Sequence, residues 1–229
     1  VNVGLLDENA PAIDIGQPEL MLRTPDKLLA GALDALACGP GMGRSEAARK
    51  ALDAAIRSEY PLILDADALN LIAEDDERQI ALAGRTAPSV LTPHPAEAAR
   101  LLASDVASVQ SDRIATACEL ANRFKAMVLL KGCGTVIADG ADGSGSWFIN
   151  TNGNPGLATA GSGDVLTGIV AALLAQGWPA REATLAGAHL HADAADRLVA
   201  QGCGPIGLCA GELIDQARYS LNAWIVASR

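Results

Sequence analysis

Residues 152–168 read Asn152-Gly153-Asn154-Pro155-Gly156-Leu157-Ala158-Thr159-Ala160-Gly161-Ser162-Gly163-Asp164-Val165-Leu166-Thr167-Gly168. This glycine-rich loop runs directly into a segment whose large apolar residues recur at helical spacing, at Leu166, Ile169, Val170, Leu173 and Leu174. The spacing predicts a helix that packs one face on a core. Its first turn, at residues 162–164, has unpaired N–H groups and a partial positive charge, and glycines let a ligand approach the backbone. The stretch therefore predicts an anion site at the start of a helix.

A single carboxylate, Asp164, stands at the mouth of this predicted anion site. A carboxylate repels phosphate, so its presence is explained if Asp164 takes a proton from a hydroxyl that attacks the phosphate. The stretch alone therefore favours phosphoryl transfer. A tight turn with an acidic residue in the first helical turn explains Gly-Ser-Gly-Asp alone equally well, and this alternative stays open at this point.

The composition of the 229-residue chain predicts one domain with a sizeable core, over residues 1–229. Half of the residues are hydrophobic, but no apolar run reaches the roughly 18 residues that a membrane-spanning helix needs. The net charge of −10 argues against nucleic acid and against an anionic membrane as partners. A nucleotide stays possible as a ligand, because a local site can be positive in a negative protein.

The cysteines and histidines do not predict a metal centre. The five cysteines form no Cys-x-x-Cys pair, which is typical of reduced thiols in a cytoplasmic protein. His189 and His191 are two residues apart on a predicted helix and point to different sides. We therefore expect both histidines to pack rather than to bind zinc.

Four predicted strands each end in a loop of polar or glycine residues, before a helix or a turn. These loops are residues 39–43, 65–70, 92–97 and 131–135. Alternating strands and helices predict an α/β fold with a mainly parallel sheet. Ligands bind at the carboxyl ends of the strands in such sheets, so we expect the four loops and residues 161–164 to converge on one crevice.

Several helices can be placed between these strands. Ser45 is a good N-cap for a helix over residues 45–58. We predict one amphipathic helix over residues 109–124 and an alanine-rich helix over residues 180–200. The acidic residues 74–77 indicate a solvated loop.

Five motifs in one order resemble those of the ADP/ATP-dependent NAD(P)H-hydrate dehydratases, members of the ribokinase-like superfamily. They are Gly39-Pro40-Gly41-Met42-Gly43, Asp65-Ala66-Asp67-Ala68-Leu69-Asn70, Thr92-Pro93-His94-Pro95-Ala96-Glu97, Lys131-Gly132-Cys133-Gly134-Thr135 and Ala160-Gly161-Ser162-Gly163-Asp164-Val165-Leu166. The resemblance covers the chain from about residue 20 to its end. It implies a ribokinase-like fold, with a mainly parallel sheet and helices on both faces.

The resemblance also implies an activity. Members of this family dehydrate (6S)-NADHX and (6S)-NADPHX, the hydrated forms of NADH and NADPH, back to NADH and NADPH. The terminal phosphoryl group of ADP or ATP goes to the C6 hydroxyl of the hydrate, and phosphate is then eliminated. For this chain the resemblance implies ADP, with ATP left open, together with Mg²⁺, a cytoplasmic location and a homotetramer.

The family's site residues carry over where the motifs match. Asp164 is then the catalytic base. The implied substrate-binding residues are Gly41, Gly43, His94 and Asp164. The implied nucleotide-binding residues are Lys131, Gly132, Cys133, Gly134, Thr135 and Gly163. The implied anion hole consists of the backbone N–H groups of Gly161, Ser162 and Gly163.

Purely structural roles are open for the remaining polar residues of the motifs. Asp65 and Glu97 are the candidates for holding Mg²⁺, while Glu97 can instead cap the helix that it begins. We favour a helix cap for Asp67. His94 can bond backbone at a helix start, and Lys131 can be a strand-end lysine in solvent.

One departure from the family pattern concerns the start of the chain. Family members begin with a strand and a glycine-rich loop that contributes to the substrate site, and nothing similar precedes Val1. We therefore expect either a domain that is truncated at its N-terminus or a protein that has lost a wall of its substrate site. A ribokinase-like kinase of a small alcohol and a catalytically inactive nucleotide-binding domain are the alternatives. Residues 92–94 and 65–70 favour the dehydratase.

Overall fold

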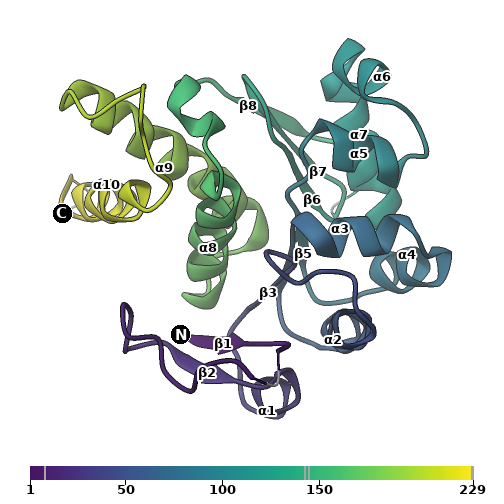
Figure 1. Cartoon of the computed structure of the whole chain (residues 1–229). Helices are drawn as coiled ribbons and strands as arrows, with labels where there is room; N and C mark the ends of the chain where they lie inside the picture. The colour runs from purple at the N-terminus through teal and green to yellow at the C-terminus, as the bar shows by residue number, and fades with distance from the viewer. Residues whose placement is uncertain (8, 142, 144, 228–229) are drawn as a thin grey trace.

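The computed structural model of the chain describes residues 1–7, 9–141, 143 and 145–227. A six-stranded sheet lies at its centre, in the order β3-β4-β5-β6-β7-β8 (Figure 1). The strands are β3 (Leu36–Cys38), β4 (Leu62–Leu64), β5 (Ser89–Leu91), β6 (Met127–Leu130), β7 (Thr135–Asp139) and β8 (Trp147–Asn150). Strands β3 to β6 pair in parallel, while β7 is antiparallel to both β6 and β8. The predicted α/β fold with a mainly parallel sheet is therefore confirmed.

Alternating side chains of the strands point into two hydrophobic cores, one on each face of the sheet. In β4, Leu62 and Leu64 belong to one core and Ile63 to the other. The first face carries α2 (Glu46–Arg57), α3 (Ala66–Ala73), α4 (Asp76–Ala83), α5 (Pro95–Leu101), α6 (Val106–Ser111) and α7 (Arg113–Phe124). The second face carries α8 (Ser162–Ala175) and α9 (Ala180–Ala200), with α10 (Glu212–Ala227) packed against them. Strands buried on both faces explain the continuous apolar runs in the sequence.

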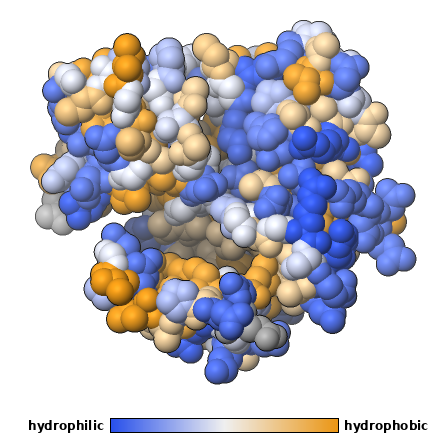
Figure 2. All heavy atoms as spheres, viewed as in Figure 1, coloured by the Kyte–Doolittle hydropathy of each residue, from blue (hydrophilic) through white to orange (hydrophobic). Residues whose placement is uncertain are grey.

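A small N-terminal unit lies beside this three-layer body. It consists of the parallel strands β1 (Asn2–Gly4) and β2 (Met21–Arg23) and the short helix α1 (Pro25–Leu29). Between this unit, β3 and α8 lies a cleft of about 1030 Å³. Figure 2 shows the cleft as a hollow between the lower part of the molecule and the rest, with hydrophobic surface along its lower wall.

Two of the predicted helices agree closely with the structure. Ser45 is the N-cap of α2, and its Oγ accepts a hydrogen bond from the N–H of Ala48 at 3.1 Å. The alanine-rich helix spans Ala180–Ala200, as predicted. No helix in the described ranges is long and apolar enough to cross a membrane.

Two predictions about helices were wrong, and aspartate caps explain both. The single helix over residues 109–124 is two helices, because the Asp112 side chain accepts a hydrogen bond from Ala115 N at 2.9 Å and starts α7. Residues 74–77 are not simply a loop, because Asp75 accepts hydrogen bonds from the N–H groups of Glu77 and Arg78 and starts α4. An aspartate at such a position is a strong helix-start signal.

Candidate active site

The five sequence motifs meet at one edge of the sheet. Lys131, at the end of β6, places its ammonium 2.7 Å from Asp65, at the end of β4, and 4.0 Å from Glu97, after β5. A Cβ added to Gly163, in the first turn of α8, would lie 3.3 Å from Lys131 Nζ. The loop after β3 also lies against Asp65, since a Cβ added at Gly39 would overlap the carbonyl of Asp65. The predicted meeting of the strand-end loops is therefore confirmed, while among these motifs the cleft is lined only by residues 39–42 and Asp164.

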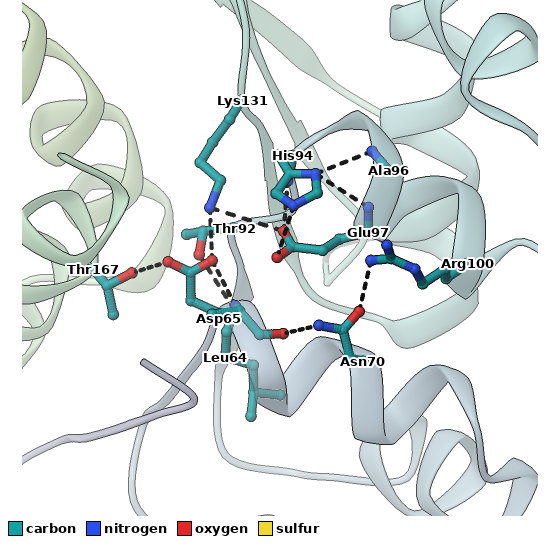
Figure 3. A network of polar contacts seen from close by, with 11 residues as sticks. Leu64, Asp65, Asn70, Thr92, His94, Ala96, Glu97, Arg100, Lys131 and Thr167 are labelled. Atoms are coloured by element: carbon teal, nitrogen blue, oxygen red, sulfur yellow. Dashed lines mark hydrogen bonds and ion pairs between the residues drawn. The ribbon is translucent and has the colours of Figure 1, made fainter. Parts of the chain in front are cut away.

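Asp65 is the centre of the polar network drawn in Figure 3. Only 1% of Asp65 is exposed. Its Oδ1 accepts hydrogen bonds from Lys131 Nζ at 2.7 Å and from the N–H of Ala66 at 2.8 Å. Its Oδ2 accepts one from the hydroxyl of Thr167, on α8, at 2.8 Å. Asp65 therefore caps α3 and also joins the loop after β6 to α8.

The network does not fit Asp65 and Glu97 as direct ligands of Mg²⁺. Octahedral Mg²⁺ needs free oxygen ligands and usually keeps several waters. Both carboxylate oxygens of Asp65 already accept hydrogen bonds. In Glu97, Oε2 accepts a hydrogen bond from the N–H of His94, and Oε1 faces the imidazole of His94. The ammonium of Lys131 also lies between the two carboxylates. Among the described residues, no cluster of three or more His, Cys, Asp or Glu side chains could hold a metal ion.

His94 and Glu97 form a reciprocal cap at the start of α5. His94 Nδ1 accepts hydrogen bonds from the N–H groups of Ala96 and Glu97, and Glu97 Oε2 accepts one from His94 N at 2.8 Å. Because Nδ1 is an acceptor, the neutral ring carries its hydrogen on Nε2, which faces Glu97 Oε1 at 3.2 Å. Burial raises the pKa of Glu97, but the hydrogen bonds from His94 and the charge of Lys131 outweigh it, so this pKa lies below its usual value.

The glycine loop after β3 is held from the first turn of α3. Asp67 Oδ2 accepts a hydrogen bond from the N–H of Gly43 at 2.8 Å. The expectation that Asp67 caps α3 was wrong, because Asp65 occupies the cap position and Asp67 lies inside the helix. Gly41 and Gly43 have positive φ values, and open space surrounds the place where a Cβ would stand. Backbone without side chains therefore faces open space at this part of the edge.

The first turn of α8 has the geometry of an anion site. Gly161 is the N-cap of α8 and has a left-handed backbone conformation, with φ 80°. The N–H of Val165 donates to the carbonyl of Gly161 at 3.1 Å. The N–H of Ser162 donates to the carbonyl of Thr159 at 3.4 Å. The first turn of a helix otherwise leaves its donors unpaired. Asp164 is exposed there and lines the cleft. Partial burial and the negative charge of Asp65 raise the pKa of Asp164, and the charge of Lys131 opposes this effect.

Helix α9 contacts the glycine-rich stretch before α8 and the first turn of α8. His191 is buried, and its Nε2 lies 3.0 Å from the hydroxyl of Ser162. Asp196 accepts hydrogen bonds from the N–H of Gly153 and the side-chain amide of Asn154, at 2.8 and 2.9 Å. Neither contact was predicted, because the partners lie 29 to 43 residues apart and no local pattern links them. His191, which we expected to pack, therefore also makes a polar contact with Ser162.

The family comparison agrees with the motif order. The chain matches the profile of the family described as NAD(P)H-hydrate dehydratase over residues 1–216. It is 46% identical over 215 residues to the ADP-dependent (S)-NAD(P)H-hydrate dehydratase of Neisseria meningitidis serogroup B, with 92% of this chain and 71% of the relative covered. It is 45% identical over 191 residues to a bifunctional NAD(P)H-hydrate repair enzyme of Moorella thermoacetica, with 83% of this chain covered. Only 35% of that bifunctional enzyme is spanned.

Solved structures extend the likeness to the fold. An ADP/ATP-dependent NAD(P)H-hydrate dehydratase from Bacillus subtilis, co-crystallised with ATP/Mg²⁺ and soaked with CoA, superposes with a TM-score of 0.75 at 30% identity. The match covers 91% of this chain and 75% of that one. A ribokinase-like superfamily protein from Enterococcus faecalis V583 gives a TM-score of 0.69 at 28% identity, over 89% of this chain and 71% of that one. The predicted ribokinase-like fold is therefore confirmed.

Proposed function

The chain belongs to the NAD(P)H-hydrate dehydratase family, and from this premise we propose that it repairs hydrated nicotinamide nucleotides. The proposed reaction converts (6S)-NADHX or (6S)-NADPHX, with ADP, into NADH or NADPH, AMP and phosphate. The main support for the proposal is that Gly163, in the first turn of α8, lies against the side chain of Lys131 at the end of β6. This meeting places a proposed anion hole beside a proposed nucleotide loop.

Asp164 is the proposed base of the phosphoryl transfer. Its carboxylate takes the proton of the C6 hydroxyl while that oxygen attacks the terminal phosphorus of ADP, and the bond to AMP breaks. The raised pKa of Asp164 supports this role, because a base works best when its pKa approaches the working pH. The ring nitrogen lone pair of the hydrate then expels phosphate, and the C5–C6 double bond of the reduced nicotinamide forms as C5 loses a proton.

The first turn of α8 and the loop after β6 are the proposed phosphate contacts. The N–H groups of Gly161, Ser162 and Gly163 lie where a helix N-terminus stabilises negative charge that develops on a transferring phosphoryl group. Lys131 supplies a positive charge next to them. We assign Gly132 to Thr135 and Gly163 to the adenine nucleotide.

The cleft beside Asp164 is the proposed site of the hydrate. Gly41 and Asp164 both line it, and the open space at Gly41 and Gly43 leaves room for a ligand against the backbone. His94 is the further proposed substrate contact. Its ring is nearly half exposed, at 46% of the side chain, although both nitrogens already serve the helix cap.

The recovery of reduced nicotinamide tests the proposed function. Purified protein is mixed with hydrated NADH, Mg²⁺ and either ADP or ATP, and the absorbance band of NADH is followed. We expect NADH to be recovered with ADP, and the comparison with ATP measures the nucleotide preference. Asp164→Asn should remove turnover and keep ADP binding. Turnover by this variant at the wild-type rate would contradict the role of Asp164.

Mg²⁺ and the homotetramer are also proposals. The Bacillus subtilis relative was co-crystallised with ATP/Mg²⁺, which supports adding the ion. A chelator that leaves NADH recovery unchanged would contradict the need for Mg²⁺. Light scattering of the purified protein tests the tetramer.

A further inference from the structure

Arg113 contacts the loop between β6 and β7 from the first residue of α7. Its guanidinium donates hydrogen bonds to three backbone carbonyls, that of Leu130 at the end of β6 and those of Cys133 and Gly134 in the loop. The distances are 3.1, 2.6 and 3.0 Å. A fourth carbonyl, of Gly132, accepts the hydroxyl of Thr135 at 3.1 Å. The carbonyls of Gly132, Cys133 and Gly134 therefore all accept hydrogen bonds from side chains of the protein itself.

These contacts direct the donors of the loop the other way. In a trans peptide, the carbonyl of one residue and the N–H of the next point in opposite directions. The first peptide illustrates this, because the carbonyl of Leu130 faces Arg113 while the N–H of Lys131 donates to Pro93 O at 2.8 Å. By the same geometry, the N–H groups of Cys133 and Gly134 point away from the side chains that hold the preceding carbonyls. Neither N–H has an acceptor within the part of the chain that the structure describes.

The position of Arg113 at the start of α7 is unfavourable for the stability of the fold. A positive charge at a helix N-terminus opposes the helix dipole, and Arg113 Nε is buried without a partner among the described residues. The loop is also fitted to the guanidinium. Gly132 has φ 152°, and a Cβ at this residue would lie 2.7 Å from Arg113 Nη2. The close approach of Arg113 therefore requires glycine at this loop position.

We propose that Arg113 is a positioning residue for the nucleotide loop, where it holds the carbonyls so that the N–H groups of Cys133 and Gly134 face the phosphates of the adenine nucleotide. The inference rests on the proposed function, because it takes residues 131–135 as the nucleotide site. Arg113 acts through the backbone, and the ordered amides then bind an anion as a preformed site.

The test compares nucleotide affinity in matched variants of the full chain. Arg113→Met removes the guanidinium, and Arg113→Lys keeps a positive charge but loses the planar fork that reaches several carbonyls. Arg123→Met is the control, because Arg123 lies in the last turn of the same helix and donates to Gln79 instead. Calorimetry with ADP gives the dissociation constants, and steady-state kinetics gives KM for ADP and kcat.

We expect both Arg113 variants to bind ADP at least about tenfold more weakly, with kcat at saturating ADP within about threefold of wild type. Hydrogen bonds to a charged phosphate are stronger than neutral ones, so the loss of ordered donors should weaken binding by at least this factor, and tenfold corresponds to about 1.4 kcal/mol. The control should bind as wild type does. A purely structural role would lower the melting temperature and leave the ADP affinity unchanged.

Wild-type affinity in Arg113→Lys, or in Arg113→Met, would overturn the inference and leave the proposed function standing. If the wild-type protein itself does not bind ADP, the proposed function fails and the inference fails with it. The Lys variant keeps the test decisive if the Met variant does not fold.

Discussion

Asp164 combines exposure to the cleft with a raised pKa, and this combination predicts the pH dependence of turnover. The proposed base works only when ionised, so kcat should fall as the pH falls through the pKa of Asp164. Burial and Asp65 raise that pKa, so the decline should begin at a pH above the ~3.9 of a free aspartate. A pH–rate profile with circular dichroism at each pH separates this decline from unfolding. A kcat that stays flat down to that pH in folded protein would contradict the assignment.

His191 predicts a pH dependence of stability rather than of chemistry. Burial lowers the pKa of His191 to about 4 in the folded protein, below its ordinary value of 6.5. The unfolded chain therefore binds more protons between these values, and stability falls as the pH drops from 6.5 towards 4. The loss from this residue approaches about 3 kcal/mol, at 1.36 kcal/mol per pKa unit.

A glutamine at this position separates titration from hydrogen bonding. His191→Gln can still bond the hydroxyl of Ser162 but does not titrate, so its urea unfolding free energy should fall less steeply over the same pH range. Equal slopes for the two proteins would contradict a buried neutral His191. The sequence alone could not predict this effect, since it depends on the contact between Ser162 and His191 of α9.

Helix α8 is held to the sheet by a polar contact inside an otherwise apolar interface. Thr167 is buried, and its hydroxyl donates to Asp65 across 102 residues of chain. Thr167→Val keeps the shape but leaves a buried carboxylate oxygen without this donor, which should cost about 1–3 kcal/mol in urea unfolding.

Thr184 provides the matched control for this substitution. It is also fully buried, on α9, but its hydroxyl bonds the carbonyl of Ala180 within the same helix. Thr184→Val should therefore cost less than about 1 kcal/mol, because that carbonyl can keep its helical partner. Equal losses of unfolding free energy in the two variants would show that the hydrogen bond from Thr167 to Asp65 adds no stability of its own.

The elements that the sequence predicted well are those with strong local signals. The buried strands stand out as apolar runs before polar loops, and Ser45 marks a helix start. The starts at Asp75 and Asp112 were missed, because acidic or continuous helical patterns concealed the caps. The polar network at Asp65 could not be predicted from the sequence, since its partners Lys131 and Thr167 lie in distant segments that only the fold brings together.

At the scale of the whole molecule, the motif order predicted the convergence but not the shape of the site. Parallel strands place their carboxyl ends at one edge, so the loops could be expected to meet. The N-terminal unit carries few signals in residues 1–30, and its position as a wall of the cleft follows only from the structure. The sequence therefore predicted the meeting of the loops better than the shape of the cleft proposed for the hydrate.

The central claim is that Asp164 and the first turn of α8 phosphorylate a hydroxyl in order to eliminate it. Phosphorus NMR of a reaction with hydrated NADH and ADP, read beside NADH absorbance, tests this claim most directly. We predict one AMP and one inorganic phosphate for each NADH recovered, with no lasting phosphate ester. An ester that accumulates while no NADH returns would contradict the account and indicate a kinase.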